Sequence, residues 1–255
     1  MRILVCIKQV PDPESRPELD ERKGWVKTDP WLRFRTNPCD EYALEEALRI
    51  KESFDGTVID ALSVGPERVC EVLRKAIAMG ADRAVHLHHP LDGFLAAQTT
   101  AKLIAAFAAS QGYDLILTGV MAEDDMQGLV GPMTADLLGI SCAVAVVEAR
   151  PDQLRKTIRL TCELDRGRRQ EILLPMPALI AVQSGINRPR YPSVGNMLRS
   201  RTQEIRTVVA EDGLDDLCQS VALPRKSGKT EFIEGSLDEK AEKLLGIFSK
   251  MSLLR

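Results

Sequence analysis

Aromatic residues are scarce in this chain, and its net charge is small. Phe, Trp and Tyr make up 4% of the 255 residues, so recognition of single-stranded nucleic acid by stacked bases is not expected. The formal net charge of −3 at pH 7 argues against nucleic-acid binding as the main activity. No apolar run reaches the length of a membrane span, so direct insertion into a membrane is not expected.

Cysteine pairs of the CxxC type are also missing. The six cysteines are dispersed at positions 6, 39, 70, 142, 162 and 218, a pattern that favours reduced thiols over a disulfide framework or an iron–sulfur site. The first strand-like stretch, Arg2–Val10, contains Lys8 and has no cleavage-site signature, so it is not interpreted as a secretion signal. We therefore expect a cytoplasmic protein.

All three histidines fall in one cluster, His86, His88 and His89. His86 and His88 would lie on one face of a strand, but a metal site needs further ligands and the sequence places none. No Ser-His-Asp or Cys-His arrangement can be assembled from a single cluster. We expect no metal site and no catalytic residues.

Apolar, strand-like runs alternate with segments of helical spacing. Such alternation predicts right-handed βαβ crossovers and a mostly parallel sheet, an α/β fold. The expected strands are 3–7, 57–64, 83–87, 113–118, 141–147 and 175–183, and the expected helices are 41–52, 67–79, 95–109 and 129–138.

Three further segments complete the predicted organisation. Residues 11–38 are polar and form a long excursion that could hold a hairpin, and 156–174 alternate around Gly167 like an antiparallel hairpin. Residues 204–235 lack periodicity. Helix 236–250 follows them, with capping-box spacing of Ser236 and Glu239. Its apolar stripe of Leu244, Leu245 and Phe248 needs a partner surface. The predicted division is an α/β domain at 1–203 and a C-terminal arm at 204–255.

One loop has the position of a phosphate site. An expected strand ends at Thr118, an expected helix begins near Leu129, and Gly119–Gly131 connects them. Ligands of open α/β sheets bind at the carboxyl ends of strands, and a helix N-terminus favours a phosphate that Gly128 would let approach closely. The spacing is neither GxGxxG nor Walker A, so a solvated acidic turn stays an alternative.

A second loop, Ile186–Met197, combines two prolines, two arginines, a tyrosine and a glycine. Core packing does not require this mixture, and function concentrates on surface loops carried by a rigid scaffold.

Four segments, read in order, give the chain a family resemblance that runs from about Met1 to about Arg201. Together they resemble the β subunit of electron transfer flavoproteins. This resemblance implies a Rossmann-like sheet of adenine-nucleotide-binding type. The segments are MRILVCIKQVPDP, TNPCDEYALEEALRIKE, LRKAIAMGADRAVHL and DLILTGVMAEDDMQGLVGPMTADLLG.

The resemblance implies an adenine nucleotide, usually AMP, in this subunit. The matching positions are Cys6, Asn37, Pro38, Cys39, Asp40, Val64, Ala122, Asp125, Gly128, Leu129 and Val130. Many relatives have polar side chains where this chain has Gly128–Val130, which leaves backbone donors for the phosphate. Glu123–Asp125 add negative charge, which requires that some carboxylates point away or that a cation sits between them.

The resemblance also implies FAD, held mainly by an α subunit at the subunit interface. Relatives place an aromatic over the flavin where this chain has Cys39, and another where it has Pro13. Both substitutions change the flavin contacts from this subunit.

Partner docking is the role that the resemblance implies for Ile186–Met197. The apolar anchor matches Val194, with Arg190 and Tyr191 beside it, and flanking arginines could steer an acidic partner. The implied partners are an α subunit, acyl-CoA dehydrogenases, and a membrane-linked electron transfer flavoprotein:quinone oxidoreductase.

The expected function is electron transfer from flavin dehydrogenases to that quinone reductase, without bond chemistry in this subunit. Two alternatives stay open. One is an electron-bifurcating variant in which a second FAD replaces AMP. The other is a non-redox adenine-nucleotide-binding module.

Overall fold

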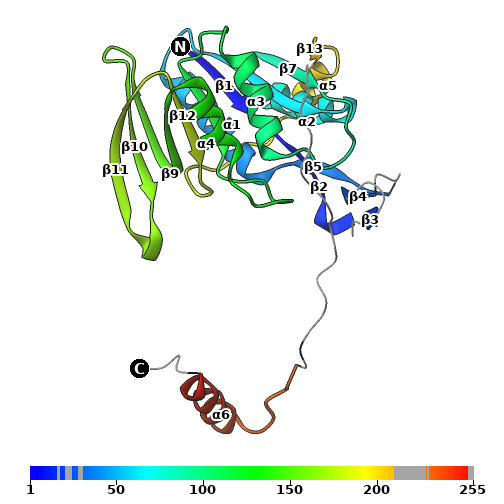
Figure 1. Ribbon diagram of the computed structural model, residues 1–255, viewed down its shortest axis with the longest axis vertical. Helices are drawn as coiled ribbons and strands as arrows, with labels where there is room; N and C mark the ends of the chain where they lie inside the picture. The colour runs from blue at the N-terminus through cyan, green and yellow to red at the C-terminus, as the bar shows by residue number, and fades with distance from the viewer. Residues whose placement is uncertain (16–17, 21–24, 28–30, 210–227, 229, 252–255) are drawn as a thin grey trace. The chain divides into compact units, whose positions relative to one another are not determined.

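Nine strands form the central sheet of the molecule (Figure 1), in the order β11-β10-β9-β12-β8-β1-β6-β7-β13. The computed structural model describes residues 1–15, 18–20, 25–27, 31–209, 228 and 230–251. The strands are β1 (Arg2–Cys6), β6 (Val58–Gly65), β7 (Arg83–His88), β8 (Leu115–Gly119), β9 (Ser141–Asp152), β10 (Thr157–Glu163), β11 (Arg169–Pro175), β12 (Ala178–Val182) and β13 (Arg206–Val209).

Parallel pairing runs through the sheet from β9 to β13. At the opposite end of the sheet, beyond β9, strands β10 and β11 form an antiparallel hairpin. The short 3-10 turn η3 (Asp165–Gly167) connects them. The predicted α/β fold, with a mostly parallel sheet and a β-hairpin insertion, is confirmed.

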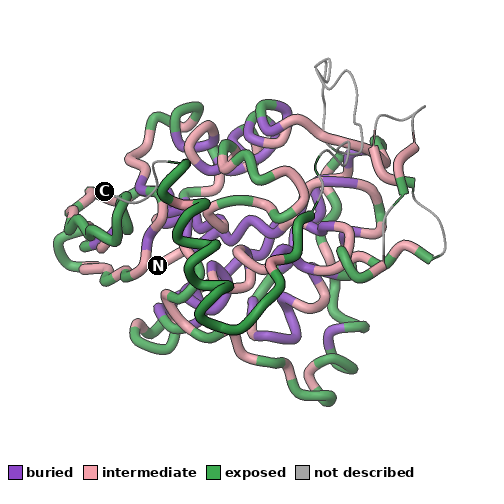
Figure 2. Tube along the Cα trace, turned by 90° about the horizontal axis from the view of Figure 1, so that it is seen from below, coloured by how far each residue is buried: buried purple, intermediate pink, exposed green. Residues whose placement is uncertain are grey.

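Helices cover both faces of the sheet. Helices α1 (Pro38–Ser53) and α2 (Cys70–Met79) pack on one face, and α3 (Ala97–Ala108) and α4 (Val130–Leu138) pack on the other. Strand β1 shows the consequence, because Ile3 and Val5 join the core under α1 whereas Leu4 and Cys6 join the core under α3 and α4. Burial on both faces explains why this strand is a continuous apolar run, and Figure 2 shows buried residues through the middle of the sheet.

The starts of two helices differ from the prediction. Helix α1 begins at Pro38 rather than Glu41, because proline suits the first helical position. Asn37 stands at its N-cap position, but its side chain makes no capping hydrogen bond. The expected helix 67–79 opens with a 3-10 turn, η2 (Glu67–Val69), and then continues as α2.

The polar excursion at 11–38 contains the short pairings that the sequence suggested. Strand β2 (Gln9–Pro11) pairs with β5 (Phe34–Thr36), and β3 (Leu19–Asp20) pairs with β4 (Trp25–Val26), both antiparallel. A 3-10 turn, η1 (Pro13–Ser15), follows β2. These pairings place Trp25 and Phe34 on the wall of the pocket described below.

The chain divides into two compact units, Met1–Val221 and Ala222–Arg255. Strand β13 was not predicted, because four residues at a sheet edge carry too short a pattern, yet it pairs with β7 and belongs to the first unit. In the second unit, α6 (Leu237–Lys250) has the predicted Ser236–Glu239 capping box and no buried residue. The division at residue 203 and the packing of the arm on a partner stay predictions.

None of the described helices combines the length and the hydropathy that crossing a bilayer requires.

Candidate functional site

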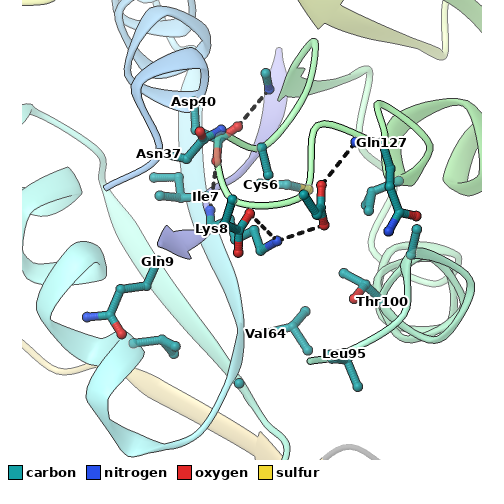
Figure 3. A pocket seen from close by; sticks show the side chains of 18 of the residues that line it. Cys6, Ile7, Lys8, Gln9, Asn37, Asp40, Val64, Leu95, Thr100 and Gln127 are labelled. Atoms are coloured by element: carbon teal, nitrogen blue, oxygen red, sulfur yellow. Dashed lines mark hydrogen bonds and ion pairs between the residues drawn. The ribbon is translucent and has the colours of Figure 1, made fainter. Parts of the chain in front are cut away.

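An open pocket lies where β1, β6 and β8 end, at the carboxyl edge of the parallel strands (Figure 3). The space between its lining atoms amounts to about 1160 Å³ when the open solvent at its mouth is included. Cys6 and Val64 come from the strand ends, and Leu95 and Thr100 from the segment around the start of α3. This is the edge where open α/β sheets bind ligands.

Most of the residues predicted for a nucleotide site meet at this pocket, although they come from four separate segments. Pro38 and Cys39 do not line it. They belong to the first turn of α1, and Cys39 lies directly behind Gly119. The predicted residues that line the pocket are Cys6, Asn37, Asp40, Val64, Ala122, Asp125, Gly128, Leu129 and Val130.

Asn37 and Asp40 tie the start of α1 to the pocket loop. The Asn37 amide donates to the backbone carbonyl of Met121 at 2.9 Å and accepts from the backbone N–H of Glu123 at 3.1 Å. The Asp40 carboxylate accepts from the backbone N–H groups of Lys8 at 2.8 Å and Gly119 at 2.9 Å. These bonds hold both side chains against the pocket loop, and neither caps α1.

Asp40 is expected to make folding stability depend on pH. Burial raises the pKa of this carboxyl to about 6, although the backbone donors oppose the shift. Because the folded-state pKa lies above the unfolded value of 3.8, the Asp40 carboxyl contributes to folding stability at low pH. This contribution is lost as pH rises through 6. At about 1.4 kcal/mol per pKa unit, the change amounts to about 3 kcal/mol.

Urea unfolding of the wild type and of Asp40→Asn at several pH values checks this expectation. The amide cannot titrate, and its loss of one acceptor oxygen costs the same at each pH. The stability of the wild type relative to the variant should therefore fall by about 2 kcal/mol between about pH 4 and pH 7. A difference between the two proteins that stays constant with pH contradicts the expectation.

Lys8 offsets part of the negative charge of the acidic loop Glu123–Asp125. Its ammonium lies 2.7 Å from Asp124 Oδ1 and 3.0 Å from Asp125 Oδ2, while Glu123 turns to Arg35 at 2.6 Å. Burial works to lower the pKa of Lys8, but the charges of the two aspartates outweigh it, so the pKa is raised. Burial raises the pKa of Asp124 despite the ammonium. The acidic loop is thus folded onto a lysine and is not a fully solvated turn.

Sequence reasoning missed Lys8 as a site residue. The available signal was a lone cation directly after a buried strand, opposite an acidic run. Arg68 was also missed, and here the sequence carries no signal. Arg68 stacks on the Phe34 ring at 4.0 Å and donates to Gln9 at 2.5 Å, and all three line the pocket.

The start of α4 can receive an anion. Its N-cap residue, Leu129, offers no capping side chain, so the first-turn N–H groups are left for another acceptor. Gly128 adopts φ 64°, and a Cβ there would lie 3.1 Å from the Val120 carbonyl. The Thr118 hydroxyl, on the same wall, is buried without a hydrogen-bond partner. The backbone donors of the first turn are therefore the groups left to receive an anion at the start of α4.

The two cysteines of the predicted site are neutral thiols. Burial raises the pKa of Cys6 far above its ordinary value, and Asp40 adds to the shift. Burial also raises the pKa of Cys39. Neither side chain is poised as a thiolate nucleophile.

The predicted docking residues lie on a loop fixed to α1. Arg190 pairs with Glu45 at 2.8 Å and with Glu52 at 2.6 Å. These bonds raise its pKa and satisfy much of its charge within the chain. Tyr191 is 95% exposed and Val194 is 77% exposed. Val194 is the first residue of the short helix α5 (Val194–Ser200), so part of the expected loop is helical.

Comparison with known proteins identifies the family of the chain. The family described as electron transfer flavoprotein domain matches residues 33–213. The "Electron transfer flavoprotein subunit beta" of Methylophilus methylotrophus is 32% identical, over 98% of this chain and 98% of its own. That of Bacillus subtilis is 30% identical over 97% of each chain. The "Electron transfer flavoprotein subunit beta, mitochondrial" of Arabidopsis thaliana is 31% identical over 96% of this chain and 97% of its own. The chain therefore belongs to the electron transfer flavoprotein family, as a β subunit with a role in electron transfer.

Proposed function

We propose that this chain pairs with an α subunit that holds FAD at the interface, and that its own pocket holds AMP. The complex takes electrons from acyl-CoA-type flavin dehydrogenases and passes them to a membrane-linked quinone oxidoreductase. It works in the cytoplasm. The observation that carries the proposal is the meeting of nine residues, predicted from the family pattern, around one pocket at the strand ends.

The pocket chemistry supports a phosphate-bearing ligand. The uncapped start of α4 and the glycine at 128 favour an anion. The single charge of Lys8 offsets part of the negative charge of Asp124 and Asp125, so the acidic loop does not repel a phosphate with its full charge. The apolar part of the wall, which includes Leu62, Val64 and Leu95, suits the flat face of a base.

Native mass spectrometry of the complex, purified with the subunit expressed beside it, tests the proposal. One FAD and one AMP per heterodimer is the expected composition. Two FAD molecules would replace the proposal with the electron-bifurcating alternative. A nucleotide-bearing chain with neither flavin nor partner would replace it with the non-redox module.

Removing the Lys8 charge should cost the pocket its nucleotide. In Lys8→Met, two carboxylates with side chains only 10% and 13% exposed lose their shared cation and face the phosphate. Breaking a buried ion pair from one side costs about 3–5 kcal/mol, and the partial exposure of Lys8 places this pair at or below the low end. We expect the AMP content after purification to fall at least tenfold. A tenfold loss of affinity corresponds to about 1.4 kcal/mol of binding free energy.

Lys51→Met is the control, since Lys51 is about as exposed as Lys8 and pairs with a carboxylate, Asp82, away from the pocket residues. Lys8→Arg keeps the charge and should retain AMP better than Lys8→Met. Equal AMP content in Lys8→Met and the wild type would show that the lysine does not support the ligand.

A further inference from the structure

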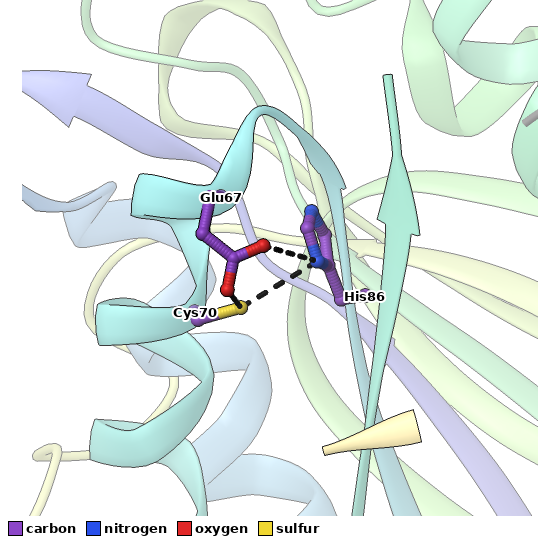
Figure 4. A group of neighbouring side chains, drawn as sticks. All are labelled: Glu67, Cys70 and His86. Carbon is purple, nitrogen blue, oxygen red and sulfur yellow. Dashed lines mark hydrogen bonds and ion pairs between the residues drawn. The ribbon is translucent and has the colours of Figure 1, made fainter. Parts of the chain in front are cut away.

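A cluster of three metal-ligating side chains lies outside the features used so far. Glu67 in η2, Cys70 at the start of α2 and His86 on β7 place their donor atoms within 4.8 Å of one another (Figure 4). Cys70 Sγ lies 3.5 Å from His86 Nδ1 and 3.7 Å from Glu67 Oε1, and Nδ1 lies 3.9 Å from Glu67 Oε2. All three donors therefore converge on one point.

These separations fit one tetrahedral cation. With Zn–S of about 2.3 Å and Zn–N of about 2.0–2.1 Å, a tetrahedral zinc holds its sulfur and nitrogen ligands about 3.5 Å apart. Cys70 and His86 already have that spacing. One Glu67 oxygen must move closer to the other two donor atoms, and this side chain is 84% exposed and so has room to adjust.

His86 is oriented as a metal-ligating histidine. Its ring is fully buried, and Nε2 lies 2.8 Å from the carbonyl oxygen of Gly65. Because a carbonyl oxygen only accepts, Nε2 carries a hydrogen, and Nδ1 is the ring nitrogen that faces Cys70 and Glu67 and is free to bind a metal through its lone pair. A backbone carbonyl on the second ring nitrogen is the usual support of a metal-bound imidazole.

Without a cation, the cluster has more acceptors than hydrogens. The thiol hydrogen of Cys70 can serve either Nδ1 or the Glu67 carboxylate, but not both at full strength. Burial, and then the Glu67 carboxylate, raise the pKa of this thiol, so the free cysteine is protonated. A bound cation would replace that hydrogen and would be coordinated by the Cys70 sulfur, His86 Nδ1 and a Glu67 oxygen together.

We propose that Glu67, Cys70 and His86 bind a divalent cation of the zinc type. The Cys70 S–H bond breaks, a thiolate–metal bond forms, and one proton leaves to solvent for each ion bound. The fourth position stays open to water on the side of the exposed Glu67. The sequence suggested no metal site because it placed no ligands beside the histidines. Folding supplies two of them from the neighbouring helix start.

Cobalt(II) titration of the untagged complex, stripped with a chelator, tests the site. Co²⁺ bound to a thiolate gives a charge-transfer absorption band, and we expect this band to saturate at one equivalent. Zn²⁺ should displace the cobalt. Calorimetry with Zn²⁺ in buffers of different ionisation enthalpy should report about one proton released per ion.

Two variants and two matched controls complete the test. Cys70→Ser should abolish the band, whereas Cys142→Ser, which removes a half-buried thiol elsewhere, should keep it. Glu67→Gln should weaken Co²⁺ binding by at least about tenfold, whereas Glu71→Gln changes an exposed carboxylate outside the cluster and should leave binding unchanged. The proposal is overturned by a wild type without the band, by a band that survives Cys70→Ser, or by equal effects of the two glutamate variants.

Discussion

Replacing Gly119 by alanine is expected to empty the pocket that we propose for AMP. A Cβ at this position would lie 2.5 Å from Asp40 Oδ1, 2.6 Å from Cys39 Cβ and 2.7 Å from the Cys39 backbone carbon. All three atoms belong to residues in the first turn of α1, and the two atoms of Cys39 are fixed to the helix backbone, so they cannot move aside alone. Strand β8 must therefore shift away from α1, and the hydrogen bond from the Gly119 N–H to Asp40 is lost.

The expected result for Gly119→Ala is a fall in co-purified AMP of more than tenfold. Overpacking of this kind also costs about 1–3 kcal/mol of folding stability. Heat extraction and quantification of the nucleotide measure the first effect, and thermal unfolding measures the second.

Gly93→Ala is the matched control for this change. Gly93 lines the same pocket, but a Cβ there meets only Leu91 side-chain carbons at 3.6 Å and 3.7 Å, which is ordinary contact. It should retain AMP and stability. Full AMP content in Gly119→Ala would show that the contact between β8 and α1 does not hold the loop in place for the ligand.

Replacing Val194 by aspartate should slow electron uptake from the proposed dehydrogenase partner by tens of fold at subsaturating concentration. The side chain is 77% exposed, so the change leaves the core untouched. An apolar anchor in a partner pocket contributes roughly 1–3 kcal/mol, and a buried unpaired carboxylate adds a further cost. The loop itself should stay in place, because Asn187 donates to Tyr42 and Glu46, and Arg190 holds Glu45 and Glu52.

The measurement is the rate of flavin reduction by a reduced acyl-CoA dehydrogenase, with a small artificial reductant as control. Only the first rate should fall. Val209→Asp, at a valine that is 72% exposed on β13, is the matched substitution and should change neither rate. A Val194→Asp protein that loses both rates equally has a structural defect, and one that loses neither removes this residue from the docking surface.

The contrast between Arg190 and Val194 refines the docking hypothesis. The sequence grouped Arg190 with the flanking arginines that could steer an acidic partner. In the structure its guanidinium is held by two carboxylates of α1, so little of its charge is left for an incoming surface. Its contribution to docking would come from fixing the loop that presents Tyr191 and Val194.

Local patterns in the sequence were enough to predict most of the fold. The apolar run of β1, the helical spacing of α1 and α3, and the alternation of β10 and β11 each extend over several residues, and these periods identify an element without reference to the rest of the chain. The Ser236–Glu239 capping box is another signal that neighbouring residues carry by themselves. Strand β13 was not predicted, because four residues are too few to show the alternation of apolar and polar residues that identifies a strand.

The tertiary structure alone decided which side chains meet at the sites. Lys8 lies 116 residues from Asp124, Asp40 lies 79 residues from Gly119, and Glu45 lies 145 residues from Arg190. Each of these pairs, like Cys70 with His86, depends on which strands are neighbours and on which face a helix packs. Those choices come from burying the whole core at once, so no local period or spacing encodes them.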